Sequence, residues 1–142
     1  MKLLAKPISA NEYRKYYFNV GKSWNWIDRM VMEDEELEKK INAKGTEVYV
    51  LTVEGREAGY CEFVPGENFC EIQYFGLFED FVGRGLGKVF LNWAVEKAWT
   101  YNAKHIQLNT CSLDHPRALE TYKKAGFKIV NTKTEERKIS VR

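Results

Sequence analysis

The sequence predicts an α/β (α+β) domain built on a mixed, mostly antiparallel sheet of about seven strands with helices on both faces. Three observations support this: a run of three β-rich segments, apolar positions at helical spacing on either side of that run, and the resulting element order βααβββαβαββ. The chain has 142 residues, of which 44% are hydrophobic and 14% aromatic. Such a chain can form a core without disulfides or a metal, so we expect residues 1–142 to form a single domain.

The first third of the chain is predicted to form one strand and two helices. Residues 2–8 are expected to be a short strand, and residues 10–20 a helix that ends at Gly21. Residues 34–43 are expected to form a second helix, with acid-first i,i+4 ion pairs on a solvated face. The side chains expected to face the core from these helices are Tyr13, Tyr16, Tyr17, Val20, Leu37 and Ile41.

The middle of the chain predicts an antiparallel meander. Residues 47–53, 57–64 and 69–78 are rich in β-branched and aromatic side chains, and the first two segments are joined through Glu54-Gly55-Arg56 as a hairpin. Gly76 is unusual in an otherwise bulky strand. It fits a β-bulge, a close approach by a ligand, or a simple packing compromise.

The second half of the chain predicts helices alternating with strands. Residues 105–110 alternate apolar and polar side chains as a strand, Pro116 opens a helix that closes at Gly126, and residues 127–130 and 138–141 are the last two strands. Before them, a long amphipathic helix is indicated by the apolar stripe Leu86, Val89, Phe90, Trp93, Ala94, Ala98 and Tyr101.

Composition excludes several classes of protein. The formal net charge of +2 is too small to indicate nucleic-acid binding. No apolar run approaches the ~18 residues that span a bilayer, and the N-terminus has no secretory core, so a cytoplasmic protein without membrane contact is expected. Cys61, Cys70 and Cys111 are widely spaced without a C-x-x-C pair, which argues against a disulfide scaffold or a metal site.

Charge is distributed unevenly between the two halves of the chain. Residues 1–70 carry 10 Lys and Arg against 12 Asp and Glu, whereas residues 71–142 carry 12 against 8. A polyanionic ligand is therefore expected to prefer the second half.

The most informative segment is the glycine loop, residues 81–88, with the sequence FVGRGLGK. Its three glycines at every second position let the backbone approach a ligand and turn several N–H groups the same way, and the following helix N-terminus adds donors suited to phosphate. A tight turn without a ligand explains one or two of these glycines. The spacing does not fit a dinucleotide fingerprint, a Walker loop or a kinase loop.

Two motifs resemble the GNAT superfamily of N-acetyltransferases. Val82-Gly83-Arg84-Gly85-Leu86-Gly87 is similar to the family's acyl-CoA pyrophosphate loop, although Val82 stands where Gln or Arg is usual. The family's second motif is matched in spacing further along the chain, with His115 where Asn is usual. Its residues here are His115, Ala118, Tyr122, Gly126 and Phe127. The predicted element order is also that of the family, so the resemblance covers nearly the whole chain.

The resemblance implies a GNAT-like fold that uses acetyl-CoA as co-substrate and no metal. The fourth strand then diverges from the fifth, and the pantetheine arm lies against main-chain groups near Phe75 and Leu77. A main-chain N–H near Phe75 would polarise the acetyl carbonyl. Main-chain N–H groups hold the phosphates, with Arg84 and Lys88 as point charges. The implied cofactor-binding residues are Phe75, Leu77, Val82, Gly83, Arg84, Gly85, Leu86, Gly87, Lys88 and His115.

Candidates exist for the proton transfers of acetyl transfer. Glu71 is the candidate base because it lies between apolar neighbours and precedes Val82 by 82 − 71 = 11 positions, the offset of the catalytic Glu in the histone-acetyltransferase branch of the family. Glu62 is a reserve candidate for the base. Alternatively, Glu71 is an ordinary exposed carboxylate on a strand, and water alone serves as the base in many family members. Tyr122 falls on the family's tyrosine and is the candidate acid, since a phenol pKa near 10 resembles that of a thiol.

The acceptor is expected under the aromatic loop at residues 23–29, SWNWIDR. Trp24 and Trp26 line an acceptor pocket or pack into the core, Asp28 suits an ammonium group, and Arg29 suits a carboxylate. We therefore expect a small molecule with a primary amine, and an apolar or aromatic acceptor fits the local excess of aromatic residues. Acetylation of a protein or peptide amine and a non-catalytic acyl-CoA-binding module are the alternatives. A monomer or a homodimer is compatible with the sequence.

Overall fold

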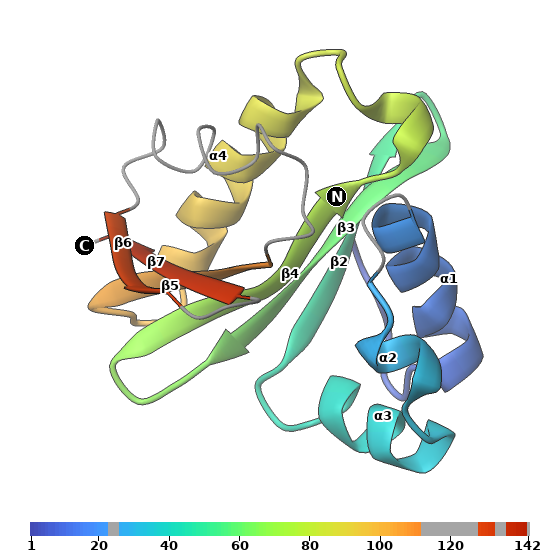
Figure 1. The fold of residues 1–142 in the computed structure, drawn as a ribbon, viewed down its shortest axis with the longest axis horizontal. Helices are drawn as coiled ribbons and strands as arrows, with labels where there is room; N and C mark the ends of the chain where they lie inside the picture. Colours follow the sequence, from blue (N-terminus) through green and yellow to red (C-terminus); the bar gives the residue numbers. More distant parts are fainter. Residues whose placement is uncertain (23–25, 112–127, 133–135, 142) are drawn as a thin grey trace.

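A computed structural model describes the backbone of residues 1–22, 26–111, 128–132 and 136–141, and the side chains of residues 1–22 and 26–108. Figure 1 shows the order of the elements along the chain. They are β1 (Lys2–Leu3), α1 (Ala10–Gly21), α2 (Asp28–Val31), α3 (Asp34–Ile41), β2 (Glu47–Val53), β3 (Arg56–Pro65), β4 (Phe69–Leu77), the 3₁₀ turn η2 (Glu79–Phe81), α4 (Leu86–Trp99), β5 (His105–Cys111), β6 (Lys128–Thr132) and β7 (Glu136–Val141). The helix predicted from Pro116 to Gly126 lies outside the described residues.

The strands form one mixed sheet in the order β1-β2-β3-β4-β5-β7-β6. Among the described strands only the β4–β5 pair is parallel, and the other neighbouring strands are antiparallel. The predicted meander β2-β3-β4 is confirmed. Its first hairpin turns through Glu54 and Gly55, both with positive φ (52° and 79°), which is the conformation of a two-residue type I′ turn.

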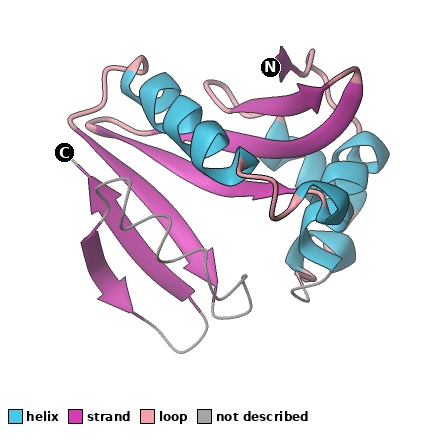
Figure 2. Cartoon of the chain, turned by 90° about the horizontal axis from the view of Figure 1, so that it is seen from above, coloured by secondary structure: helices cyan, strands magenta, loops and turns pink. Residues whose placement is uncertain are grey.

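Helices cover both faces of the sheet. In Figures 1 and 2, α1, α2 and α3 lie on one side of the central strands and α4 on the other. Alternation along β3 separates two cores: Tyr60 packs with α1 and α3, whereas Cys61 and Phe63 pack with α4. The predicted α+β architecture with helices on both faces is thus confirmed.

The core faces of the first helices follow the predicted spacing. The side chains of Tyr13, Tyr16, Tyr17 and Val20 on α1 are buried, and those of Leu37 and Ile41 on α3 are fully buried. The Ser9 hydroxyl accepts from the backbone N–H of Glu12, which caps the start of α1.

Three sequence predictions need correction. The first strand spans Lys2–Leu3 rather than residues 2–8, because Pro7 has no backbone N–H to pair and the following residues turn into the core at Ile8. Asp28–Val31 is a short helix within the predicted loop. On α4 the buried stripe is Phe90, Leu91, Ala94 and Ala98, so Val89 faces solvent with 68% exposure, and the helix ends at Trp99.

A β-bulge interrupts the β3–β4 pairing. Glu62 pairs with Tyr74 and Phe63 with Ile72, which places Gln73 opposite no residue of β3. The bulge therefore lies three residues before Gly76, and of the alternatives for this glycine the β-bulge does not hold, since Gly76 pairs in register with Tyr60. A Cβ at Gly76 would lie 2.3 Å from Cγ1 of Val20, so close packing of α1 against β4 explains this glycine.

Gly76→Ala is expected to lower the free energy of unfolding by about 1–3 kcal/mol, because the new methyl group overlaps Val20. Val20→Ala removes that overlap but leaves a cavity. We expect the double variant to be more stable than the sum of the two single losses predicts, by at least about 1 kcal/mol in denaturant unfolding. Strict additivity would show that another contact excludes a side chain at position 76.

Candidate functional site

The sheet opens between β4 and β5. Their parallel pairing runs from Phe69–His105 to Ile72–Leu108 and stops there, although β4 continues to Leu77. The end of the pairing coincides with the bulge at Gln73. In the described part of the chain, the edge of β4 over residues 73–77 pairs with no strand on the β5 side. The divergence of the fourth strand from the fifth is confirmed.

The glycine loop adopts a conformation that requires glycine at two positions. Gly83 and Gly85 have φ values of +86° and +78°, a region that costs a residue with a Cβ about 1–2 kcal/mol. A Cβ at either position would meet nothing within 4 Å, so conformation rather than space selects these glycines. Gly87 has no positive φ, and a Cβ there would lie at an ordinary 3.9 Å from Leu77. Conformation therefore does not explain the third glycine.

The loop leads directly into the N-terminus of α4. Gly85 is the N-cap residue and has no side chain, so the first-turn N–H groups receive no capping hydrogen bond from the N-cap residue. The buried Phe81 anchors the loop, with the guanidinium carbons of Arg84 and Arg56 each 5.1 Å from its ring centre. An uncapped helix start with a partial positive charge favours an anion.

The loop and the open edge of β4 adjoin each other. The approach of Leu77 to Gly87 places the end of β4 beside the first turn of α4. Phe75 packs on Phe90 of α4, with ring centroids 4.5 Å apart. Of the predicted loop residues, Leu86 and Gly87 are half-buried. The residues Val82, Gly83, Arg84, Gly85 and Lys88 are exposed.

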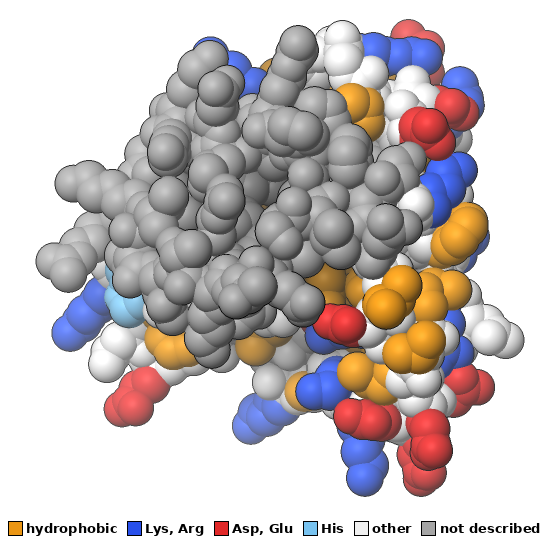
Figure 3. All heavy atoms as spheres, viewed as in Figure 1, with side chains coloured by type: hydrophobic (Ala, Val, Ile, Leu, Met, Phe, Trp, Pro, Cys, Tyr) orange, Lys and Arg blue, Asp and Glu red, His pale blue; other side chains and the backbone are white. Residues whose placement is uncertain are grey.

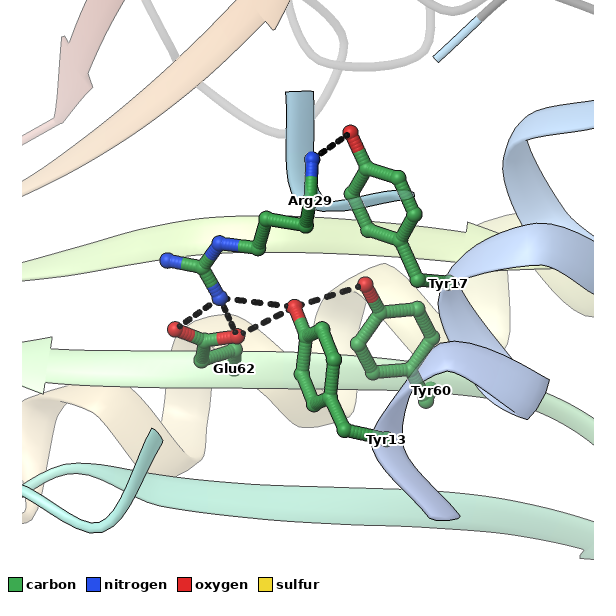
Figure 4. A network of polar contacts seen from close by, with 5 residues as sticks. All are labelled: Tyr13, Tyr17, Arg29, Tyr60 and Glu62. Carbon is green, nitrogen blue, oxygen red and sulfur yellow. Dashed lines mark hydrogen bonds and ion pairs between the residues drawn. The ribbon is translucent and has the colours of Figure 1, made fainter. Parts of the chain in front are cut away.

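On the opposite face of the sheet, Arg29 of α2 forms a buried ion pair with Glu62 of β3 (Figure 4). Its Nη1 donates to both carboxylate oxygens, at 2.7 and 3.0 Å, and to the Tyr13 hydroxyl at 2.8 Å. Tyr13 donates to Glu62 at 2.7 Å, and its hydroxyl lies 3.1 Å from that of Tyr60. Glu62 is 1% and Arg29 6% exposed, so the pair is shielded from water.

The tyrosines of this network are neutral. Burial raises the pKa of Tyr13 and of Tyr60 well above the usual value, and burial likewise raises the pKa of Tyr74. Burial alone would lower the pKa of Arg29, but the neighbouring Tyr13 and Glu62 raise it. Arg29 therefore keeps its positive charge in the ion pair with Glu62.

An aromatic cluster lies next to the ion pair. The rings of Tyr17, Trp26 and Tyr74 have centroids 5.3–5.6 Å apart, and the guanidinium carbon of Arg29 lies 4.6 Å from the Tyr74 ring centre. A Cβ at Gly21 would lie 2.4 Å from Cβ of Trp26, so Gly21 gives room for that tryptophan. Trp26 is half-buried and Asp28 exposed, whereas Trp24 lies outside the described residues.

Hydrophobic side chains also gather on the surface over α1 and α2, as Figure 3 shows. They belong to α1, to α2 and to the residue that precedes α2. The exposed members are Phe18, Ile27, Met30 and Val31.

Of the candidate catalytic residues, the structure describes the two glutamates but not the tyrosine. Glu71 is half-buried and pairs with Val64 across β3–β4, on the same face of the sheet as Glu62. The carboxylate of Glu62, the reserve base, is bound by Arg29 and Tyr13, which suits a structural role better than proton transfer. Tyr122 and His115 lie outside the described residues.

The described cysteines are not reactive groups. Cys61 and Cys70 are buried free thiols, and burial raises the pKa of Cys70 to about 12 and that of Cys61 well above its usual value. Within the described ranges, no group of three His, Cys, Asp or Glu side chains is placed to hold a metal ion. Nor does any helix in those ranges have the length and apolar character needed to cross a bilayer.

A mixed sheet that opens between β4 and β5, with a glycine loop entering α4 beside the opening, is the α+β arrangement that the resemblance to the acetyltransferase family implies. Residues 10–127 match the acetyltransferase (GNAT) family, and the chain belongs to this family. It is therefore a GNAT-type N-acetyltransferase, as the two sequence motifs predicted.

Solved structures share the fold at low sequence identity. PaiA N-acetyltransferase from Thermoplasma acidophilum, in complex with coenzyme A, is 14% identical with a TM-score of 0.67, covering 100% of this chain and 99% of that one. A GNAT acetyltransferase from Elizabethkingia anophelis with acetyl-CoA bound is 17% identical with a TM-score of 0.65, covering 78% and 83%. Aminoglycoside 6′-acetyltransferase type Ii is 14% identical with a TM-score of 0.69, covering 99% and 96%. No curated protein matches the sequence.

Proposed function

We propose that this protein transfers the acetyl group of acetyl-CoA to the primary amine of a small molecule, by direct attack in a ternary complex. One observation carries the proposal: the glycine loop, with two left-handed glycines at an uncapped helix start, adjoins the open edge of β4 over residues 73–77. Two of the solved structures of this fold contain CoA or acetyl-CoA, which supports the choice of co-substrate.

The loop fits the diphosphate of the co-substrate. Its main-chain N–H groups and the first turn of α4 supply donors, and the exposed Arg84 and Lys88 supply positive charge. Val82, Gly83, Leu86 and Gly87 complete the proposed contact surface, and the proposal assigns His115 to the pantetheine arm. A diphosphate bound by main-chain N–H groups would explain why the loop requires the left-handed backbone conformation of glycine and not a particular side chain.

The open edge of β4 fits an extended arm that lies beside the strand. Main-chain groups near Phe75 and Leu77 are proposed to hold that arm, and an N–H group near Phe75 to polarise the acetyl carbonyl as negative charge develops on its oxygen. The side chains of both residues point into the α4-side core. Packing thus fixes this stretch of backbone for the reaction.

The proposed reaction needs two proton transfers. The amine nitrogen attacks the thioester carbon, so that a C–N bond forms and the C–S bond breaks. Glu71, directly or through water, takes the proton that the amine loses, and Tyr122 donates a proton to the departing thiolate. The products are the N-acetylated amine and the free thiol of CoA.

A small acceptor is supported by the α1–α2 side of the site. The half-buried Trp26 beside Tyr17 and Tyr74, and the apolar surface over α1 and α2, suit an apolar or aromatic-bearing amine. Asp28, at the start of α2, is exposed and suits an ammonium group. Trp24 is proposed to line the acceptor site together with Trp26. Two further solved structures of this fold are named for small-molecule acceptors, aminoglycosides and nourseothricin.

Turnover and binding together test the proposal. We expect release of free thiol from acetyl-CoA with at least one amine of a small-molecule panel, and stabilisation by CoA of about 2.7 kcal/mol at ~100 times its Kd. Stabilisation without turnover on any amine would identify a non-catalytic acyl-CoA-binding module. Turnover confined to peptide amines would identify a protein acetyltransferase. No stabilisation would contradict the proposed co-substrate.

Gly85→Ala is expected to raise the Kd for CoA about tenfold, because the left-handed conformation costs alanine about 1–2 kcal/mol. Gly45→Ala is a matched control. Gly45 also has a positive φ of +89° with no neighbour within 4 Å of a Cβ, but it lies between α3 and β2. Calorimetric titration should show weakened CoA binding only for Gly85→Ala. Equal Kd values for the two variants would remove the loop from the binding site.

A further inference from the structure

Arg29 uses only one of its three guanidinium nitrogens within the described part of the chain. Nη1 makes all the hydrogen bonds that the guanidinium forms with the described residues, and their acceptors are Glu62 and Tyr13. Figure 4 shows Nη2 pointing away from Glu62. Nε and Nη2 together carry three N–H donors that have no partner among the described residues, although the residue is only 6% exposed.

Unpaired donors on a buried cation are unusual. Buried polar groups are nearly always hydrogen-bonded, and leaving them unpaired costs stability. Nε and Nη2 lie on the same edge of the planar guanidinium, and such an edge binds the two oxygens of a carboxylate through parallel hydrogen bonds. The unpaired edge of Arg29 therefore has the geometry of a carboxylate site.

The unpaired edge lies on the proposed acceptor side. The Arg29 guanidinium stacks over Tyr74, which pairs with Glu62 at the bulge and directly precedes Phe75, the residue near which the acetyl carbonyl is proposed to lie. The hydrogen bonds of Nη1 to Glu62 and Tyr13 hold the guanidinium in place. The Nε–Nη2 edge carries only N–H donors, so it can bind a carboxylate but offers no acceptor to an ammonium group. Donors on a charged guanidinium form strong bonds to a carboxylate.

We propose that Arg29 binds a carboxylate of the acceptor through Nε and Nη2, so that the acceptor is an amino carboxylate, an amine with an amino-acid-like anionic group. This rests on the proposed function and narrows its substrate class. Glu62 is a positioning residue, which fixes the orientation of Arg29 without touching the acceptor. The neighbouring Tyr17, Trp26 and Tyr74 suit an aromatic side chain on the same molecule.

Matched pairs of amines test this site: phenylalanine against phenethylamine, and tryptophan against tryptamine. The wild-type protein is expected to favour the amino acid of each pair by about ten- to a hundredfold in kcat/KM, the worth of a charge-assisted hydrogen-bonded pair. Arg29→Lys keeps the charge beside Glu62 but lacks the Nε–Nη2 edge. We expect it to bring the ratio within each pair close to one, mainly through KM for the amino acid.

A binding measurement keeps the test independent of turnover. Phenylalanine and tryptophan are expected to raise the Tm of the wild-type protein in the presence of CoA, and to raise that of Arg29→Lys much less. Should Arg29→Lys fail to fold, the double variant Arg29→Met/Glu62→Leu removes the edge without leaving a charge and is expected to lose the same preference.

The outcomes separate the two proposals. Turnover of amines without preference for the carboxylate, or an equal loss in Arg29→Lys for both members of a pair, would overturn the carboxylate site and leave acetyl transfer intact. An Arg29-dependent Tm shift without turnover would support the site and contradict the transfer reaction. If phenyl phosphate raised the Tm more than phenylacetate does, the proposed carboxylate site would be overturned and a phosphate site favoured instead.

Discussion

Arg29→Met is expected to lower the free energy of unfolding by about 3–5 kcal/mol, because it leaves the carboxylate of Glu62 buried without its cation. Glu62 is 1% exposed and accepts two bonds from Nη1 of Arg29. Among the described residues, the Tyr13 hydroxyl is the partner that remains for it. Urea unfolding followed by tryptophan fluorescence measures the loss.

The double variant Arg29→Met/Glu62→Leu separates a lost attraction from an uncompensated charge. Replacing a buried ion pair with apolar side chains is often neutral, so we expect the double variant to recover most of the stability. Tyr13 and Tyr60 can still bond to each other through their hydroxyls, 3.1 Å apart. Losses that simply add would contradict this account, since each residue would then contribute independently.

A surface ion pair provides the control. Lys15 and Glu57 lie 3.0 Å apart with side chains 50% and 35% exposed. Lys15→Met is expected to change the free energy of unfolding by less than about 1 kcal/mol, because water screens exposed pairs and solvates the remaining charge. The contrast with Arg29→Met measures what burial adds.

Much of the fold could be predicted because the spacing of apolar residues indicates which face of a helix or strand is buried. The meander and the core faces of α1 and α3 follow directly from it. The Asp28–Val31 helix could not be found this way, because four residues are about one turn and show no period. Val89 was assigned to the wrong face because it adjoins Phe90, and one residue rotates a helix by about 100°.

The candidate site also has a part that the sequence predicts and a part that it does not. The glycine loop is local, so spacing alone located it, and the left-handed φ values of Gly83 and Gly85 fit that prediction. The Arg29–Glu62 pair joins residues 33 positions apart through packing of α2 over β3, and no sequence interval encodes that contact. The only available signal was a carboxylate between the apolar residues Cys61 and Phe63. Both flanking residues face α4 while Glu62 faces the other side.

Glu71→Gln is expected to lower kcat about 10²- to 10⁴-fold while leaving the KM for acetyl-CoA nearly unchanged, because the amide keeps the shape of the side chain but cannot accept the amine proton. The proposed role of Glu71 rests on its half-buried place on the same face of the sheet as the Arg29–Glu62 pair, one strand away from it. Glu67→Gln is the matched control, since Glu67 is an exposed carboxylate in the turn between β3 and β4.

The pH dependence distinguishes a protein base from water. An aliphatic amine with a pKa of about 10.4 is almost wholly protonated near neutral pH, so the variant depends on the small neutral fraction. The rate of Glu71→Gln should therefore rise about tenfold per pH unit between pH 7 and 9, and the deficit relative to wild type should shrink. A loss below about threefold at every pH would mean that water removes the proton and that Glu71 serves only the strand.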